Sequence, residues 1–273
     1  AEREVAVIRR PAVAGQFYPG NPESLRAFLE GAVRPGPEDI PAVGVVSPHA
    51  GYVYSGRVAG AVFARVRVPD AVVLLGPNHT GLGTEASIVS RGAWATPLGP
   101  VAIHEGLAEA LKAEAALFQE DALAHAHEHS LEVQVPFLQH RNPGVRIVPV
   151  AFMLRDRAAV EEAGEAVASV VARWPDPVLL VASSDMTHYE PDEKAREKDA
   201  RAIERVLALD PEGLLDTTKR FGITMCGVIP TAVLLVAARR LGASGGELVT
   251  YATSGEVSGD LGSVVGYAGM LIR

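Results

Sequence analysis

The sequence predicts an α/β fold in which a mixed central sheet lies between two layers of helices, an α/β/α sandwich. Apolar runs without polar alternation recur along the chain, which is typical of strands that are covered on both faces. Helical patterns separate these runs, as in layered α/β proteins. A hairpin pattern and two strand patterns close together near the C-terminus favour a mixed sheet over an all-parallel one.

The strand signals are rich in valine and leucine. The six clearest cover residues 43–46, 72–75, 146–152, 178–182, 248–253 and 264–271. A further pair, residues 86–91 and 100–103, surrounds a turn with proline and glycine and predicts the hairpin.

The first predicted helix follows Asn21, which suits the N-cap position, and has Pro22 in its first turn. The other helical patterns cover residues 55–65, 105–114, 130–140, 157–173, 192–209 and 228–241. No internal repeat, low-complexity segment or long linker interrupts the alternation. A single domain over residues 1–273 is therefore the simplest interpretation.

Composition excludes several classes of function. The net charge is −8 with acidic and basic residues interleaved, and no basic stripe supports nucleic-acid binding. No apolar run reaches the roughly 18 residues of a membrane span. Residues 1–10 lack a secretory apolar core. Cys226 is the sole cysteine, which excludes an internal disulfide and fits a reducing compartment. We expect a cytoplasmic protein.

Histidines follow two of the predicted strands. His49 comes after residues 43–46, and His79 after residues 72–75. The strand at 178–182 leads into Asp185 and His188. One such histidine is more often a structural residue than a ligand. Three endings of this kind predict a shared site, because ligands of open α/β sheets bind beyond the carboxyl ends of the strands.

Asp185 and Cys226 each allow two interpretations. Asp185 can orient an imidazole while His188 moves a proton, or it can cap a helix. Cys226 precedes a helix with Pro230 in its first turn, and a helix N-terminus favours the thiolate, a metal ligand or nucleophile. A free cysteine is equally often a small buried apolar residue.

Further candidates surround these residues. Glu128 and His129 precede an amphipathic pattern and are expected to face the pocket, whereas His125 and His127 are expected to be solvated. Asn78 adjoins His79 and is assigned to the pocket. Tyr52 and Tyr54 follow His49, where tyrosines can hold a substrate or donate a proton, although packing is the more frequent role. These assignments complete the list of pocket residues: Tyr52, Tyr54, Asn78, Glu128 and His129.

Six motifs occur in the order typical of one family. They are AGQFYP (14–19), PHAGYVYSG (48–56), GPNHTG (76–81), EHSLEVQVPFL (128–138), SSDMTHY (183–189) and CG (226–227). In these motifs the chain resembles the Memo-like family along nearly its whole length, in the form of protein B of the AmmeMemoRadiSam system. No single motif would identify the family, but their number and order are specific.

The resemblance implies a fold like that of the catalytic subunits of class III extradiol ring-cleaving dioxygenases. Those enzymes hold iron(II) with two histidines and a glutamate and use a further histidine as acid/base. By resemblance, His49 and His79 stand at the histidine ligand positions and His188 at the acid/base position. Cys226 stands where the enzymes have their carboxylate, and Asp185 belongs to the vestibule.

The cysteine departs from the dioxygenase ligand set. A thiolate makes the site softer, so copper and zinc become better candidates while iron stays possible. We therefore expect one transition metal ion: iron, copper or zinc. A thiolate beside a redox metal and oxygen is readily oxidised, which argues against ring cleavage.

The expected function is metal binding in a dioxygenase-type vestibule, linked to redox chemistry, as an oxidoreductase on an unknown small molecule or peptide. One alternative is a module that binds a peptide or partner in the same vestibule without catalysis. Others are an extradiol-type dioxygenase and a metal-dependent hydrolase. The compact, arginine-rich form resembles prokaryotic members, which implies a pathway shared with radical SAM and AMMECR-type proteins.

Overall fold

The computed structural model describes residues 7–34 and 39–273, so most of the segment 1–10, in which the sequence shows no secretory apolar core, lies outside the described residues. A nine-stranded mixed sheet forms the centre of the molecule. Its strands run in the order β10 (His188–Glu190), β12 (Val264–Ile272), β2 (Gly44–Ser47), β9 (Val178–Ser183), β3 (Ala71–Pro77), β8 (Arg146–Phe152), β4 (Ala86–Ile88) and β7 (Gln119–Glu120), and β11 (Gly246–Thr253) pairs with β12.

Strands β2, β9, β3 and β8 are parallel to one another, whereas β12 is antiparallel to β2 and β4 is antiparallel to β8. Every residue of β2 and β3 is buried, as expected for central strands between two helical layers. The mixed sheet predicted from the sequence is therefore confirmed.

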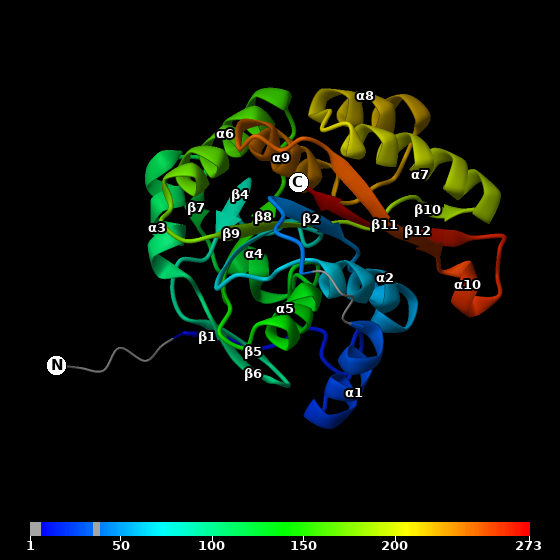
Figure 1. The fold of residues 1–273 in the computed structure, drawn as a ribbon, viewed down its shortest axis with the longest axis horizontal. Helices are drawn as coiled ribbons and strands as arrows, with labels where there is room; N and C mark the ends of the chain where they lie inside the picture. Colours follow the sequence, from blue (N-terminus) through cyan, green and yellow to red (C-terminus); the bar gives the residue numbers. More distant parts are fainter. Residues whose placement is uncertain (1–6, 35–38) are drawn as a thin grey trace.

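Helices cover both faces of this sheet, below and above it in Figure 1. One layer contains α1 (Pro22–Ala32), α2 (Tyr52–Arg65) and α5 (Val135–Arg141), which share a core with the sheet. The other contains α3 (Glu105–Glu114), α6 (Arg157–Arg173), α7 (Asp192–Leu207), α8 (Pro211–Phe221) and α9 (Val228–Arg240), with a core of their own. These two cores confirm the predicted three-layer α/β/α sandwich.

The first helix begins as predicted, since the backbone N–H of Ser24 donates to Oδ1 of Asn21 at 2.8 Å. The pattern at residues 130–140 instead gives a short 3₁₀ turn, η1 (Glu132–Gln134), before α5. Helix α8 was not predicted, although Asp210 caps it, Pro211 opens it and Gly222 ends it in the left-handed conformation. Two short helices, α4 (Leu123–Ala126) and α10 (Gly255–Ser258), complete the described helices.

The predicted hairpin was wrong in its pairing. Strand β4 is fully buried and joins the main sheet, where it pairs with β8 and β7. The hairpin consists of β5 (Ala93–Thr96) and β6 (Gly99–Ala102), in a separate sheet with β1 (Ile8–Arg9). Gly92, with a φ of +91°, separates β4 from β5, and apolar content alone did not reveal this break. Among the described helices, none has the length and apolar character needed to cross a membrane.

Candidate metal centre

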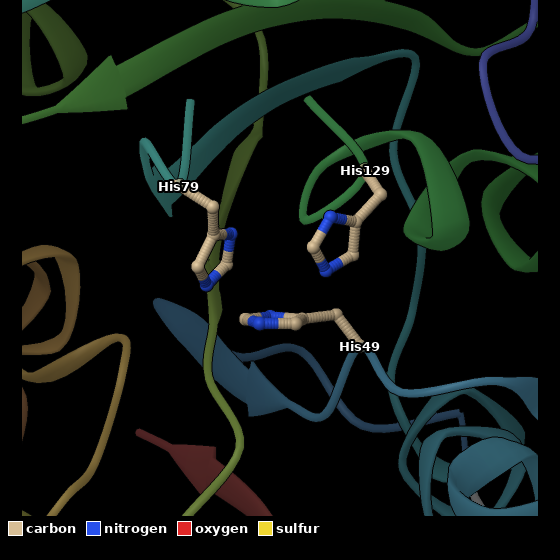
Figure 2. Close-up of side chains that lie close together, drawn as sticks. All are labelled: His49, His79 and His129. Carbon is tan, nitrogen blue, oxygen red and sulfur yellow. The ribbon is translucent and has the colours of Figure 1, made fainter. Parts of the chain in front are cut away.

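The parallel strands β2, β9 and β3 lie side by side, so the loops after their carboxyl ends meet at one edge of the sheet. His49 follows β2 and His79 follows β3, and His129 enters from the segment that precedes η1. Figure 2 shows the three rings facing one another. One ring nitrogen of each lies within 4.8 Å of the others, close enough for a single metal ion to reach them.

The ring planes distinguish the three imidazoles. His49 stands at 74° to His79 with ring centroids 5.3 Å apart, whereas His79 and His129 are stacked at 17° and 4.7 Å (Figure 2). An imidazole nitrogen offers its lone pair in the plane of its ring. The planes of His49 and His79 cross, so an ion on their line of intersection lies in the plane of both rings, whereas the nearly parallel, stacked rings of His79 and His129 do not share such a position unless one ring turns.

Glu128 holds His79 in place. Its Oε1 accepts a hydrogen bond from Nδ1 of the His79 ring at 2.9 Å, and its Oε2 accepts one from the backbone N–H of His79. The N–H groups of His129 and Ser130 also donate to Oε1. Burial disfavours the ionised carboxyl, but these bonds outweigh burial and lower the pKa of Glu128 to about 2. A carboxylate partner fixes the proton on Nδ1 and leaves Nε2 as the ligand atom.

His49 is held in a similar way, although the partner of its ring is a neutral hydroxyl. Its Nδ1 lies 2.9 Å from Oγ of Ser183, and its backbone N–H donates to Oδ1 of Asp185 at 2.7 Å. The ring is only 2 % exposed. Burial, and then the neighbouring His79 and His129, lower the pKa of His49 well below its usual value. The imidazole is therefore neutral, the form that binds metals.

Cys226 lies on the other side of His49, just before α9. Its Sγ is 3.2 Å from Nε2 of His49 and accepts a hydrogen bond from the backbone N–H of Asp185 at 3.3 Å. It lies outside the close group of three histidines. Burial, and then the charge of Asp185, raise the pKa of Cys226 far above its usual value. Of the two interpretations of Cys226 that the sequence left open, the neutral buried thiol is favoured in the protein without an ion, because desolvation outweighs the helix end.

His188 and Asp185 lie beside this group. The backbone N–H of His188 donates to Oγ1 of Thr224 and its ring Nδ1 donates to the Thr224 carbonyl at 2.9 Å, which leaves Nε2 able to accept a proton. Burial raises the pKa of Asp185 to about 6, partly opposed by the N–H groups of His49 and Ala50. Asp185 therefore braces the backbone at His49, in place of the helix cap considered from the sequence.

Two of the predicted pocket residues, Tyr52 and Asn78, have structural roles. Tyr52 is buried in the core, where its hydroxyl donates to the Val133 carbonyl at 2.6 Å. Asn78 braces its own loop, since its Oδ1 accepts from two backbone N–H groups and its Nδ2 donates to the Leu82 carbonyl. Tyr54 is 42 % exposed at the start of α2. Packing therefore explains Tyr52 and loop formation explains Asn78.

The expectation that His125 is solvated was also wrong. The ring is buried against Trp94 and its Nε2 donates to the Ser87 carbonyl, whereas His127 is exposed as expected. Sequence reasoning also missed Ser183 and Gln134, two buried polar residues that contact each other beneath His49. Gln134 lies in the family motif 128–138 and Ser183 in the motif 183–189, and their place in these motifs was the one sequence feature that could have indicated them.

The donor set fits a transition metal ion. His49 and His79 are both held through Nδ1, which presents Nε2 of each as a free donor, and a thiol lies next to one of them. The side chains of His79 and His129 are 35 % and 24 % exposed, so solvent and small molecules reach the site. Imidazole and thiol donors are the ligands that zinc, copper and iron accept.

Comparison with known proteins places the chain in a family. A family model described as "Memo-like protein" matches residues 9–271. A MEMO1 family protein of Methanopyrus kandleri is 47 % identical over 97 % of this chain and 99 % of its own length. A MEMO1 family protein of Methanothermobacter thermautotrophicus is 43 % identical over 96 % of this chain and 99 % of its own length.

A solved structure has the same fold at much lower identity. An uncharacterized protein from Escherichia coli superimposes with a TM-score of 0.54 and 15 % identity, over 84 % of this chain and 98 % of that one. The likeness concerns the arrangement of helices and strands alone. The family model and the relatives spanning nearly the whole chain show that this protein belongs to the Memo-like family.

Proposed function

We propose that the protein binds one transition metal ion through Nε2 of His49, Nε2 of His79 and Sγ of Cys226. The observation that carries this proposal is the shared orientation of the two imidazoles, whose Nδ1 atoms are bonded to Ser183 and Glu128. A hydrogen bond at the ring nitrogen that does not face the ion is typical of metal-ligating histidines. The Sγ of Cys226 lies 3.2 Å from His49, a separation suited to two ligands of one ion.

His129 has a different role in this proposal. Its ring plane is nearly parallel to that of His79, at 17°, which suits a shared ion less well than the crossed planes of His49 and His79. Burial, and then the neighbouring His79, lower the pKa of His129, which supports a neutral imidazole next to the ion. We assign His129 to the wall of the substrate pocket.

Two imidazoles and a thiolate favour copper(I) or zinc, with iron as the third candidate. A bound ion of this kind supplies an electron-pair acceptor and, for copper or iron, a site for one-electron chemistry. The protein itself supplies the proton transfer. His188 accepts or donates a proton at Nε2, and Asp185 holds the backbone of His49 in position.

The substrate of this redox-linked site is a small molecule or a short peptide, since the rings of His79 and His129 are open to solvent. Family membership supports a pathway shared with radical SAM and AMMECR-type proteins. Both assignments are part of the proposal, and neither is needed for metal binding.

Metal analysis of the purified protein tests the proposal. The wild type is expected to hold about one ion per chain, and His49→Ala, His79→Ala and Cys226→Ala are each expected to lose most of it. His127→Ala is the matched control, because His127 is an exposed histidine of the same region. Metal contents that are equal in all four variants would reject the proposal.

A further inference from the structure

A buried hydroxyl lies behind the metal-facing imidazole. Ser183 ends β9 and is fully buried, and its Oγ has three partners. It lies 2.6 Å from the carbonyl oxygen of Ser130, 2.8 Å from Nε2 of Gln134 and 2.9 Å from Nδ1 of His49. A hydroxyl has one proton to donate and two lone pairs to accept with, so three partners use its full capacity.

The direction of two of these bonds is fixed by chemistry. A carbonyl oxygen only accepts, so the Ser183 proton points to Ser130. The side chain of Gln134 faces Ser183 with its amide nitrogen, since the same nitrogen also approaches the carbonyl oxygens of Ser47 and Pro48 at 3.3 and 3.0 Å. An amide nitrogen only donates and has two protons, and its two shortest contacts are to Ser183 and Pro48. Gln134 therefore occupies one lone pair of Ser183.

The third bond then has only one possible direction. With its proton used by Ser130 and one lone pair used by Gln134, Ser183 can only accept from His49. His49 must carry its proton on Nδ1, and its Nε2 presents a lone pair toward Cys226. In the other tautomer, an N–H would face the site and no metal ion could bind at Nε2.

We propose that Ser183, directed by Gln134 and the Ser130 carbonyl, is a positioning residue that fixes the Nδ1–H tautomer of His49. The importance of this tautomer for metal binding rests on the proposed function, whereas the tautomer itself does not. The segment from Glu128 to Gln134 thereby controls both imidazoles. Glu128 holds the proton of His79 on Nδ1 directly, and Gln134 holds the proton of His49 on Nδ1 through the Ser183 hydroxyl.

Nitrogen NMR of metal-free protein labelled with ¹⁵N at histidine tests the tautomer. His49→Ala identifies the His49 signals by their loss. In the wild type, Nδ1 of His49 is expected to show a bonded proton and Nε2 none. Ser183→Ala is expected to give a mixture of tautomers or the Nε2–H form, and Ser183→Thr, which keeps the hydroxyl, is expected to restore the wild-type pattern.

Zinc affinity gives a second readout. We expect Ser183→Ala to bind zinc about 10- to 100-fold more weakly, as for other changes of groups that orient metal ligands. Ser183→Thr is expected to stay within a few-fold of the wild type. Ser87→Ala is the matched control, because Ser87 is a buried serine of the same sheet whose hydroxyl bonds to Thr84.

The outcomes are separable. A wild-type His49 with its proton on Nε2, or a folded Ser183→Ala protein with an unchanged His49 spectrum, would overturn the inference. The wild-type spectrum, assigned with His49→Ala, does not depend on Ser183→Ala, so it tests the predicted tautomer even if Ser183→Ala does not fold. If neither the wild type nor any of the variants binds zinc, the proposed function fails, while the NMR result still tests the role of Ser183.

Discussion

The sulfur of Cys226 lies 3.2 Å from Nε2 of His49, the ring nitrogen that points away from Ser183. Without an ion, the thiol keeps its proton, because burial raises the pKa of Cys226. The lone pair of His49 is the acceptor nearest to that proton. In the proposed site the same two atoms bind one ion only when the proton leaves, so metal binding there would be coupled to deprotonation of the thiol.

This coupling gives the first prediction. Zinc binding at pH 7 is expected to release about one proton per chain from the wild type, because the thiol is neutral and the pKa of His49 is lowered by burial. Titration calorimetry in buffers of different ionisation enthalpy measures this release. His129→Ala is expected to release the same amount and Cys226→Ala none. Release that persists in Cys226→Ala would show that the thiol is not a ligand.

Glu128 gives a prediction about pH. Its carboxyl is buried, and hydrogen bonds from His79 and Ser130 outweigh the effect of burial and lower its pKa to about 2 from 4.5. A lowered acid pKa stabilises the folded state above the unfolded pKa, and this stabilisation is lost as the pH falls from about 4.5 toward 2. The shift corresponds to about 3 kcal/mol at pH 7.

Urea unfolding of metal-free Glu128→Gln measures this contribution. The variant is expected to be about 2 to 3 kcal/mol less stable than the wild type at pH 7, with the difference narrowing below pH 4.5. Glu247→Gln is a suitable control, since Glu247 forms a half-exposed ion pair with Arg65. A constant difference between wild type and Glu128→Gln from pH 7 to pH 3 would contradict the assigned pKa.

The sequence predicts the parts of the site that depend on strand order. His49 and His79 follow two apolar runs, and both runs became parallel strands on either side of β9, so the two rings meet at one edge. Cys226 was predicted to be a metal ligand from the family resemblance, because no local sequence pattern links it to His49. Its position next to that ring depends on how α9 packs against the sheet, which a sequence pattern does not give.

Other features depend on three-dimensional packing alone. The stacking of His129 on His79 and the burial of His125 are set by side-chain contacts that the His-x-His-x-His pattern does not distinguish. The state of the thiol stayed open between a thiolate and a buried neutral thiol, because a helix end is visible in sequence, whereas desolvation is not. Tyr52 was assigned to the pocket because it follows His49, although the first turn of α2 directs its ring into the core.

Glu132 carries a prediction about stability. This buried carboxylate accepts hydrogen bonds from the Tyr18 hydroxyl, from the backbone N–H groups of Ala12 and Val13, and from the Arg9 guanidinium. It thereby fastens the N-terminal segment whose Phe17 ring lies 4.9 Å from that of His129. Because Glu132→Ala leaves buried donors and a cation without a partner, it is expected to destabilise the fold by about 3 to 5 kcal/mol.

Chemical denaturation of Glu132→Ala checks this value. Glu247→Ala, in the half-exposed pair with Arg65, is expected to cost less than about 1 kcal/mol. An equal effect of the two substitutions would show that the buried carboxylate is not the anchor of the segment. Amide hydrogen exchange of residues 12–18 is expected to rise in Glu132→Ala before exchange in the central strands does.

The last prediction concerns Gly266, which supports the loop that carries His188. The backbone of Gly266 pairs with the segment before His188, since it donates to the Thr187 carbonyl and accepts from Met186. A Cβ at Gly266 would lie 1.9 Å from Oδ2 of Asp199, a buried carboxylate that also accepts from the Thr187 N–H at 2.9 Å. Glycine is required here because the carboxylate occupies the place of a side chain.

Gly266→Ala must therefore displace Asp199 from Thr187 or push β12 away from α7. Overpacking of this kind is expected to cost about 1 to 3 kcal/mol in the free energy of unfolding and to shift the NMR signals of His188. Gly31→Ala is the matched control, because nothing lies within 4 Å of a Cβ at that helical position, and alanine there is expected to leave stability unchanged or slightly raised. If Gly266→Ala is as stable as Gly31→Ala and leaves the His188 signals in place, Asp199 does not support the loop that carries His188.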